Sequence, residues 1–245
     1  MKHHLGVKAY KRNKIHALTE QQKKTRRVRS QNLLKRHAQG LLPNLVFSDE
    51  KIFTVEQSLN KQNDRVYLKD KDCDKSEHLK VPRTQGPASV MVWAAITPNG
   101  RCPLVFIPQG VKVNAEVYRK SVLENCLRPW ADHHFGEEVW TFQQDSAPSH
   151  KARATKDWLR DNVPGFNSAL EWPPRSPDHN PLDFSIWSVL ESRVCAKNHT
   201  SVESLKASLR REWDLISPEI VRAACTSFVK RLREVVKARG GHIES

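Results

Sequence analysis

The 245-residue sequence lacks any apolar run approaching the roughly 20 consecutive residues that a membrane-spanning helix requires. Its first residues, MKHHLGVKAYKRNKIH, contain no apolar segment of the kind that directs secretion. These two absences argue against a membrane protein and against a secreted one. We therefore expect a soluble, intracellular protein with no membrane partner.

Cysteine is scarce, and its spacing excludes two common small-domain scaffolds. A disulfide framework or a zinc knuckle would need close, paired cysteines. The five cysteines are instead odd in number, widely separated and free of CxxC pairs: Cys73, Cys102, Cys126, Cys195 and Cys225. We expect them to be reduced thiols, most of them buried.

Acidic residues are also scarce at the start of the chain, which makes the net charge of +14 uneven. Residues 1–39 carry twelve Lys or Arg against one acid, whereas residues 40–190 sum to −1 and residues 191–245 to +4. A basic arm on a nearly neutral body indicates a polyanion partner, bound in a salt-sensitive and sequence-independent way. A tail that serves only solubility or nuclear import is the alternative. The candidate DNA contacts are Lys11, Arg12, Lys14, Lys23, Lys24, Arg26, Arg27 and Arg29.

The domain organisation follows from this change of character. Residues 1–39 predict a basic linker or arm, in which Thr19 is a candidate N-cap for a helix ending at Gly40. This segment has too little apolar surface for a core of its own. Residues 40–245 predict one folded domain, with extra helices over 200–245.

Three strands open that domain, at 45–55, 88–96 and 101–107. Asn99-Gly100 lies between the last two, and this dipeptide favours a hairpin because both residues tolerate positive φ. The polar stretch at 60–87 is too long and too charged for a simple turn. Insertions of this length in compact domains are usually functional or disordered.

The rest of the chain alternates between helix and strand signals. The expected elements are a helix at 114–130 capped by Asn114, a strand at 139–145, a helix at 149–162 capped by Ser149, a strand at 169–172, a helix at 180–194, and helices at about 201–214 and 217–239. The order βββαβαβα, followed by C-terminal helices, predicts an α/β fold with a mixed sheet flanked by helices.

Three aspartates fall where these elements should converge. Asp49 is expected at the end of the first strand and Asp145 at the end of the fourth, and sites in α/β sheets form outside strand ends. Asp183 opens the following helix. It shares a helix face, which must pack on the sheet, with Ile186, Trp187, Leu190 and Val194.

Carboxylates brought together repel, and they are costly to bury unless a cation neutralises them. An all-oxygen site suits Mg²⁺ or Mn²⁺, and two such ions about 4 Å apart support in-line displacement at a phosphodiester. Structural readings stay open. Asp49 could be a turn residue, and Asp183 could belong to a capping box with Asn180 and Pro181. His150 is either a DNA-contacting or catalytic residue, or a histidine at a helix start with neither role.

Four blocks resemble the catalytic motifs of mariner-superfamily transposases: FSDEK (47–51), VMVWAAI (90–96), QQDSAPSH (143–150) and WPPRSPDHNPLDFSIW (172–187). The resemblance runs from about Tyr10 to the last helices, in the family's order. It implies a ribonuclease-H-like fold, divalent metal, a nuclear DNA partner, and excision of an element followed by insertion at a TA dinucleotide.

The resemblance carries the family's triad onto Asp49, Asp145 and Asp183, and the 37 residues between the last two match the all-aspartate branch. The insertion at 60–87 resembles the clamp loop that grips a partner subunit, which implies a homodimer. Arg175 and His179 depart from the family pattern in the SPD loop. The paired helix-turn-helix modules that usually precede the catalytic domain are not seen, so we expect no discrimination of element ends from random DNA.

Three functions follow from these features. The first is a catalytic domain that cleaves and transfers DNA strands, which an intact triad favours. The second is a catalytically silent or host-adopted remnant that binds DNA or dimerises, and the third is a free-standing nuclease of the same fold. We predict that Asp183, not Asp178, completes a cluster of carboxylates within about 4–8 Å. Asp178 is expected to order its loop through local backbone hydrogen bonds.

Overall fold

The computed structural model describes residues 17–56, 85–107, 110–111 and 113–243. The stretch that resembles a clamp loop lies outside the described residues except for its last three positions, and Lys11, Arg12 and Lys14 lie outside them as well. No helix in the described ranges combines the length and apolar content needed to cross a membrane.

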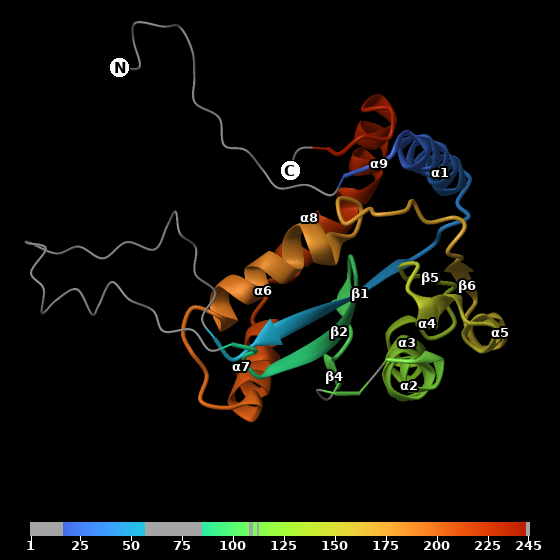
Figure 1. Cartoon of the computed structure of the whole chain (residues 1–245). Helices are drawn as coiled ribbons and strands as arrows, with labels where there is room; N and C mark the ends of the chain where they lie inside the picture. The colour runs from blue at the N-terminus through green and yellow to red at the C-terminus, as the bar shows by residue number, and fades with distance from the viewer. Residues whose placement is uncertain (1–16, 57–84, 108–109, 112, 244–245) are drawn as a thin grey trace, which may run out of the picture.

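A mixed sheet forms the centre of the molecule, as the sequence predicted (Figure 1). Its order is β3-β2-β1-β5-β6, with β4 also paired to β2. Strand β1 runs antiparallel to β2 and parallel to β5, and β5 is parallel to β6. The strands are β1 (Leu45–Thr54), β2 (Ser89–Thr97), β3 (Gly100–Arg101), β4 (Val105–Ile107), β5 (Thr141–Gln143) and β6 (Gly165–Asn167).

The predicted hairpin forms between β2 and β3, but its turn is different. Gly100 pairs with Thr97, so the turn is centred on Pro98 and Asn99, and neither Asn99 nor Gly100 has a positive φ. Glycine is required here by a close approach instead, because a Cβ at position 100 would lie 2.5 Å from the ring of His134.

Two of the predicted strands need correction. The strand expected over 101–107 is divided into β3 and β4 around Pro103, which has no N–H to donate to a ladder. The strand expected over 169–172 is wrong. That segment closes into a turn whose Ser168 carbonyl accepts two backbone hydrogen bonds, and β6 occupies the residues just before it.

Helices cover the sheet. They are α1 (Glu20–Ala38), α2 (Ala115–Val117), the π-helical η2 (Tyr118–Leu127), α3 (Arg128–Phe135), α4 (Pro148–Lys151), α5 (Arg153–Asn162), the π-helical η3 (Leu182–Ile186), α6 (Trp187–Val194), α7 (Val202–Asp214), α8 (Pro218–Thr226) and α9 (Phe228–Lys237). Asn114 caps its helix as predicted. Ser149 does not cap the next one, because it is buried within α4, and the chain turns extended at Ala152 before α5 begins.

Two apolar cores lie on opposite faces of the sheet. One contains Phe47 and the buried residues of α6 to α9, and the other contains Val46 and those of η2, α3 and α5. Figure 1 shows these two groups of helices on either side of β1 and β2. Neighbouring residues of β1 enter different cores because side chains alternate along a strand. The same alternation directs Asp49 and Glu50 to opposite faces.

Helix α1 belongs to this body and is not a detached arm. It packs along α9 (Figure 1), and its Leu33 is buried in the core on the α6–α9 face. Thr19 caps it as predicted, in a reciprocal pair of hydrogen bonds with Gln22. The apolar content of α1 is low, but two or three inward residues suffice because the rest of the domain supplies the core.

Candidate active site

The three predicted aspartates line one pocket. Asp49, Asp145 and Asp183 all contribute to a cavity of about 720 Å³, whereas Asp178 is not among its lining residues. Gln22 of α1 and the Pro-rich segment 172–177 form other parts of the wall. The pocket therefore joins four distant parts of the sequence.

The sequence predicted that Asp49 lies at the end of its strand, and this prediction is wrong. Asp49 is the fifth of the ten residues of β1. It lies at an edge because β5 is shorter. The parallel pairing of β1 with β5 stops at Phe47 and Gln143. Asp49 and Asp145 each lie two residues beyond that last pair, and this equal offset brings both carboxylates to the same end of the parallel strands.

Asp49 and Asp183 are neighbouring acids, and both have raised pKa values. Burial raises the pKa of Asp49 well above its ordinary value, and the carboxylate of Asp183 raises it further. Burial likewise raises the pKa of Asp183, to about 6, although a hydrogen bond with Asp49 opposes the shift. Trp187 Nε1 donates to Asp49 Oδ2 at 2.7 Å and fixes that carboxylate. A cation bound beside these two acids would favour their ionised forms and offset the repulsion between them.

Asp183 is positioned by the start of its helix. Asn180 ties this point to β1, since its Oδ1 accepts from the backbone N–H of Leu182 at 3.1 Å and its Nδ2 donates to the Ser48 carbonyl at 2.9 Å. Asp183 itself is more exposed than the helical pattern suggested, because it opens onto the pocket. The four apolar residues predicted to share its face are all buried: Ile186, Trp187, Leu190 and Val194.

Asp145 is held from the other face of the sheet. Its Oδ1 accepts from the backbone N–H of Ala147 at 2.8 Å and lies 2.6 Å from His150 Nδ1. Burial alone would raise the pKa of Asp145, but the hydrogen bond and charge of His150 outweigh it and the pKa is lowered. Glu50, which the sequence reasoning did not single out, lies 3.3 Å from His150 Nε2.

The sequence allowed His150 to be a DNA contact. The burial of its side chain is not compatible with that role. Its side chain is only 3% exposed and faces two carboxylates. Burial alone would lower the pKa of His150, but hydrogen bonds to Asp145 and Glu50 raise it to about 9. The histidine is therefore an internal cation near neutral pH.

Arg26 is a second correction to the predicted DNA contacts. It is fully buried, and its guanidinium donates to the carbonyls of Arg175 and Gly240, to Ser176 Oγ at 2.6 Å and to Asp178 Oδ2 at 2.6 Å. Its fifth N–H donates to the Gly241 carbonyl at 3.3 Å, so no donor is left for a phosphate. Asp178 accordingly orders its loop through this ion pair, and not through the local backbone hydrogen bonds that we expected.

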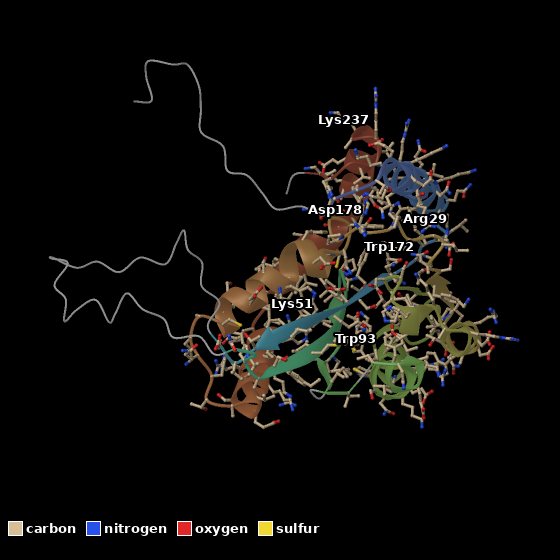
Figure 2. All side chains as sticks on the ribbon, viewed as in Figure 1. Arg29, Lys51, Trp93, Trp172, Asp178 and Lys237 are labelled. Atoms are coloured by element: carbon tan, nitrogen blue, oxygen red, sulfur yellow. The ribbon has the colours of Figure 1, made fainter. Side chains whose placement is uncertain are left out.

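The other basic residues of α1 differ in availability. Lys24 and Arg27 are exposed, whereas Lys23 pairs with Glu20 at 2.7 Å. Arg29 is directed inward and donates to the carbonyls of Ala169 and Trp172, at the junction of α1 with the pocket wall (Figure 2). Only part of the basic charge of α1 can therefore meet a polyanion.

The two departures in the SPD loop are accommodated structurally. Arg175 adopts a positive φ of 49° and donates to the carbonyl of Ala17 at 2.9 Å. His179 is buried near Ser30 and Asp178, and burial lowers its pKa to about 4. Neither lies between the three pocket aspartates.

No family model matches the sequence. The chain is 32% identical over 201 residues to the Tc3 transposase of Caenorhabditis elegans, a match that covers 81% of this chain and 57% of that protein. It is 33% identical over 155 residues to the Tcb1 transposase of Caenorhabditis briggsae, covering 63% of this chain and 54% of that protein. The matched region spans little more than half the length of these relatives.

Solved structures show the same fold. The Mos1 transposase paired-end complex with the left transposon end matches with a TM-score of 0.85 at 22% identity, over 99% of this chain and 70% of that one. The crystal structure of the catalytic domain of Mos1 mariner transposase matches with a TM-score of 0.73 at 22% identity, over 94% of this chain and all of that one. The fold is ribonuclease-H-like, as expected, the chain's homologues are Tc1/mariner transposases, and its structure matches that of the Mos1 catalytic domain.

Proposed function

We propose that this chain is the catalytic part of a cut-and-paste transposase, which hydrolyses a DNA strand at an element's end and joins the freed 3′-hydroxyl to target DNA. The observation that carries the proposal is the convergence of Asp49, Asp145 and Asp183 on one pocket. The homology to transposases supplies the reaction class.

The donor set suits a hard divalent cation. Two of the three carboxylates have raised pKa values because they are buried close together, so a bound cation is favoured over leaving both ionised. Asp49, Asp145 and Asp183 would hold Mg²⁺ or Mn²⁺, as a pair of ions in our proposal. When bound, the metal supplies activation of the attacking oxygen and stabilisation of the leaving one.

The chain's own residues arrange this chemistry. Trp187 fixes Asp49, Asn180 anchors the helix that bears Asp183, and Ala147 fixes Asp145. Opposite them, the Pro-rich wall is held by Arg26 from behind. A phosphodiester entering the pocket would meet three oriented carboxylates on one side and a rigid wall on the other.

A plasmid-nicking assay with Mn²⁺ tests the proposal. We expect nicking by the wild-type chain and a loss of at least about 100-fold in each of Asp49→Asn, Asp145→Asn and Asp183→Asn, because each removes a charged ligand. Asp161→Asn, at an exposed position of α5, controls for loss of one negative charge and should nick normally. Retained DNA binding without cleavage by the wild-type chain would instead support the silent remnant.

DNA is the proposed partner, and the exposed faces of α1 and α9 are the proposed binding surface. The cations on these faces share helical spacing and point away from the buried sides: Lys24, Arg27 and Lys35 on α1, and Lys230, Arg233 and Lys237 on α9. The two helices pack side by side, and Figure 2 shows Lys237 on α9 away from the sheet. Such a surface binds phosphates without reading sequence.

Charge reversal tests this surface without disturbing the core. The double variants Lys24→Glu/Arg27→Glu and Arg233→Glu/Lys237→Glu should each weaken binding to random DNA. The slope of log K against log salt should also become shallower, by roughly 0.9 for each phosphate that the protein no longer neutralises. Arg153→Glu/Arg160→Glu on α5 is the matched control. Unchanged slopes in both test variants would place the DNA elsewhere.

Insertion at TA dinucleotides, homodimer formation through residues 60–87 and nuclear localisation belong to the same proposal. Sequencing of insertion junctions checks the first of these. Sedimentation of the wild-type chain and of a chain with residues 60–84 replaced by a short linker checks the second, and imaging of the tagged chain in cells checks the third.

A further inference from the structure

Glu50 and His150 meet on the face of the sheet opposite Asp49. Glu50 points there because side chains alternate along β1. Helix α4 begins three residues after Asp145 and returns His150 to it, with the backbone N–H of His150 donating to the Ala147 carbonyl at 3.1 Å. The ring of Tyr118 closes the remaining side, with its centroid 4.2 Å from that of His150.

Both ring nitrogens of His150 are directed at carboxylates. Nδ1 lies 2.6 Å from Asp145 Oδ1 and Nε2 lies 3.3 Å from Glu50 Oε1. The shorter of these two contacts, from Nδ1 to Asp145, is a hydrogen bond, and the contact to Glu50 faces the opposite side of the ring. The ring is thus a buried link between β1 and the segment that follows β5.

His150 adds a second hydrogen bond to a carboxylate that Ala147 alone would hold at a single point. The Asp145 side chain is half exposed, yet its Oδ1 receives two hydrogen bonds, one from Ala147 and one from His150. In the described part of the chain no hydrogen bond uses the second oxygen, Oδ2. Two donors on one oxygen fix the plane of the carboxylate and leave the other oxygen to the pocket.

We infer that His150, itself held by Glu50, is a positioning residue that fixes the carboxylate of Asp145 for metal binding. This inference rests on the proposed function, since it needs Asp145 to be a metal ligand. Groups that orient a metal ligand typically change metal affinity or activity by about 10–100-fold when removed. Glu50 matters less than His150, because it holds the ring and not the ligand.

A competing reading makes the same three residues ligands themselves. Their donor atoms lie within 4.8 Å of one another, close enough to surround one ion. A cation there would have to break the 2.6 Å contact between His150 and Asp145 and enter at a ring that is only 3% exposed. We therefore place His150 behind the metal site, where it contacts a ligand and not the ion.

Two substitutions of His150 test its contacts with Asp145 and with Glu50 separately. Asparagine places its amide nitrogen near the position of Nδ1 and retains the bond to Asp145, whereas glutamine places its nitrogen near Nε2 and retains the bond to Glu50. In calorimetric Mn²⁺ titrations of the full chain, we expect the Kd to rise about 10–100-fold in His150→Ala and His150→Gln. It should stay within about threefold of wild type in His150→Asn and rise only a few-fold in Glu50→Gln.

A matched control distinguishes loss of the contact that positions Asp145 from a general destabilisation of α4. Thr155 is buried, and its Oγ1 donates to the Ser149 carbonyl at 2.8 Å, so Thr155→Val removes a structural bond from the same helix pair and keeps the side-chain shape. Its Tm should fall while its Mn²⁺ Kd stays at the wild-type value. An equal rise in Kd in Thr155→Val and His150→Ala would overturn the inference.

Pulsed EPR of bound Mn²⁺ tests the ligand reading directly. We expect no coupling from a coordinated imidazole nitrogen in the wild-type chain, and coupling that disappears in His150→Asn would overturn the inference. If the wild-type chain takes up no Mn²⁺, the proposed function and the inference both fail. If it takes up Mn²⁺ and His150→Ala binds equally well, the inference alone fails.

Discussion

The two aspartates of the SPDHNPLD segment lie five residues apart and have opposite surroundings. Asp178 meets the fully buried guanidinium of Arg26 at 2.6 Å, and its backbone carbonyl accepts from Arg231. Asp183 lies beside another acid, Asp49, which lines the same pocket. One carboxylate is neutralised within the chain, whereas the other is left beside a second negative charge.

This difference separates an acid in a structural ion pair from the acid that we propose as a metal ligand. A buried ion pair that is complete in the folded chain locks two segments together, here α1 and the pocket wall. Two neighbouring acids whose pKa values are raised by burial cost stability when both are ionised, and such surroundings are a feature of catalytic and metal sites. The same type of side chain therefore supports the pocket wall at position 178 and lines the pocket, as a proposed metal ligand, at position 183.

Breaking the ion pair between Arg26 and Asp178 should cause a large loss of unfolding free energy. Arg26→Met leaves the Asp178 carboxylate and several carbonyls without their donor in a buried place, and such losses cost about 3–5 kcal/mol of unfolding free energy. Urea unfolding measures it. Arg27→Met, the same change one residue along at an exposed position, should shift stability by less than about 0.5 kcal/mol. Similar values for the two variants would mean that Arg26 is dispensable.

The neighbouring His179 should make this region acid-sensitive. Burial lowers its pKa to about 4, below the ordinary 6.5, so the folded chain binds this proton less well than the unfolded chain. Stability is then complete above about pH 6.5 and is lost as pH falls toward 4, by up to about 3 kcal/mol. His179→Gln should remove this part of the pH dependence. Identical stability profiles for variant and wild type between pH 7 and 4 would contradict the assignment.

Sequence reasoning reached the pocket because its acids follow local rules. The helical face of Ile186, Trp187 and Leu190 is readable from neighbouring residues and directs Asp183 toward the sheet, whereas Asp49 was expected at the end of its strand and lies in the middle of it. The offset of Asp145 from β5 follows from strand order as well. The strand predicted at 169–172 failed because a short apolar run before two prolines resembles a strand end but closes into a turn.

Arg26 and Glu50 were missed for a different reason. Their partners lie 100 or more residues away, and local reasoning treats a charged residue in a basic or polar segment as solvated. A signal was nevertheless present. Arg26 shares its helix face with Leu33 at an offset of seven, and Glu50 shares one face of β1 with the buried Val46 at an offset of four. Charged residues at apolar positions are the ones to suspect of buried partners.

Neutralising Asp183 should change the stability of the chain by a smaller amount than the substitutions of Arg26 and His179. Asp183 has a pKa raised to about 6, so its contribution to stability is present below about pH 3.8 and is lost as pH rises through 6. At pH 7.5 with EDTA, Asp183→Asn should therefore be more stable than wild type. The gain is about 1 kcal/mol, because Asp183 opens to water and solvent screens the repulsion from Asp49.

Adding metal should reverse this order. At a free Mg²⁺ concentration of about 100 times Kd, the wild-type chain gains about 2.7 kcal/mol from binding, and Asp183→Asn forgoes most of it. Asp178→Asn is the matched variant five residues earlier, and it should be destabilised equally with and without metal because it strands Arg26 instead. Thermal unfolding of the three proteins in EDTA and in Mg²⁺ decides the matter. If Asp178→Asn reversed its order and Asp183→Asn did not, the roles given to the two acids would be exchanged.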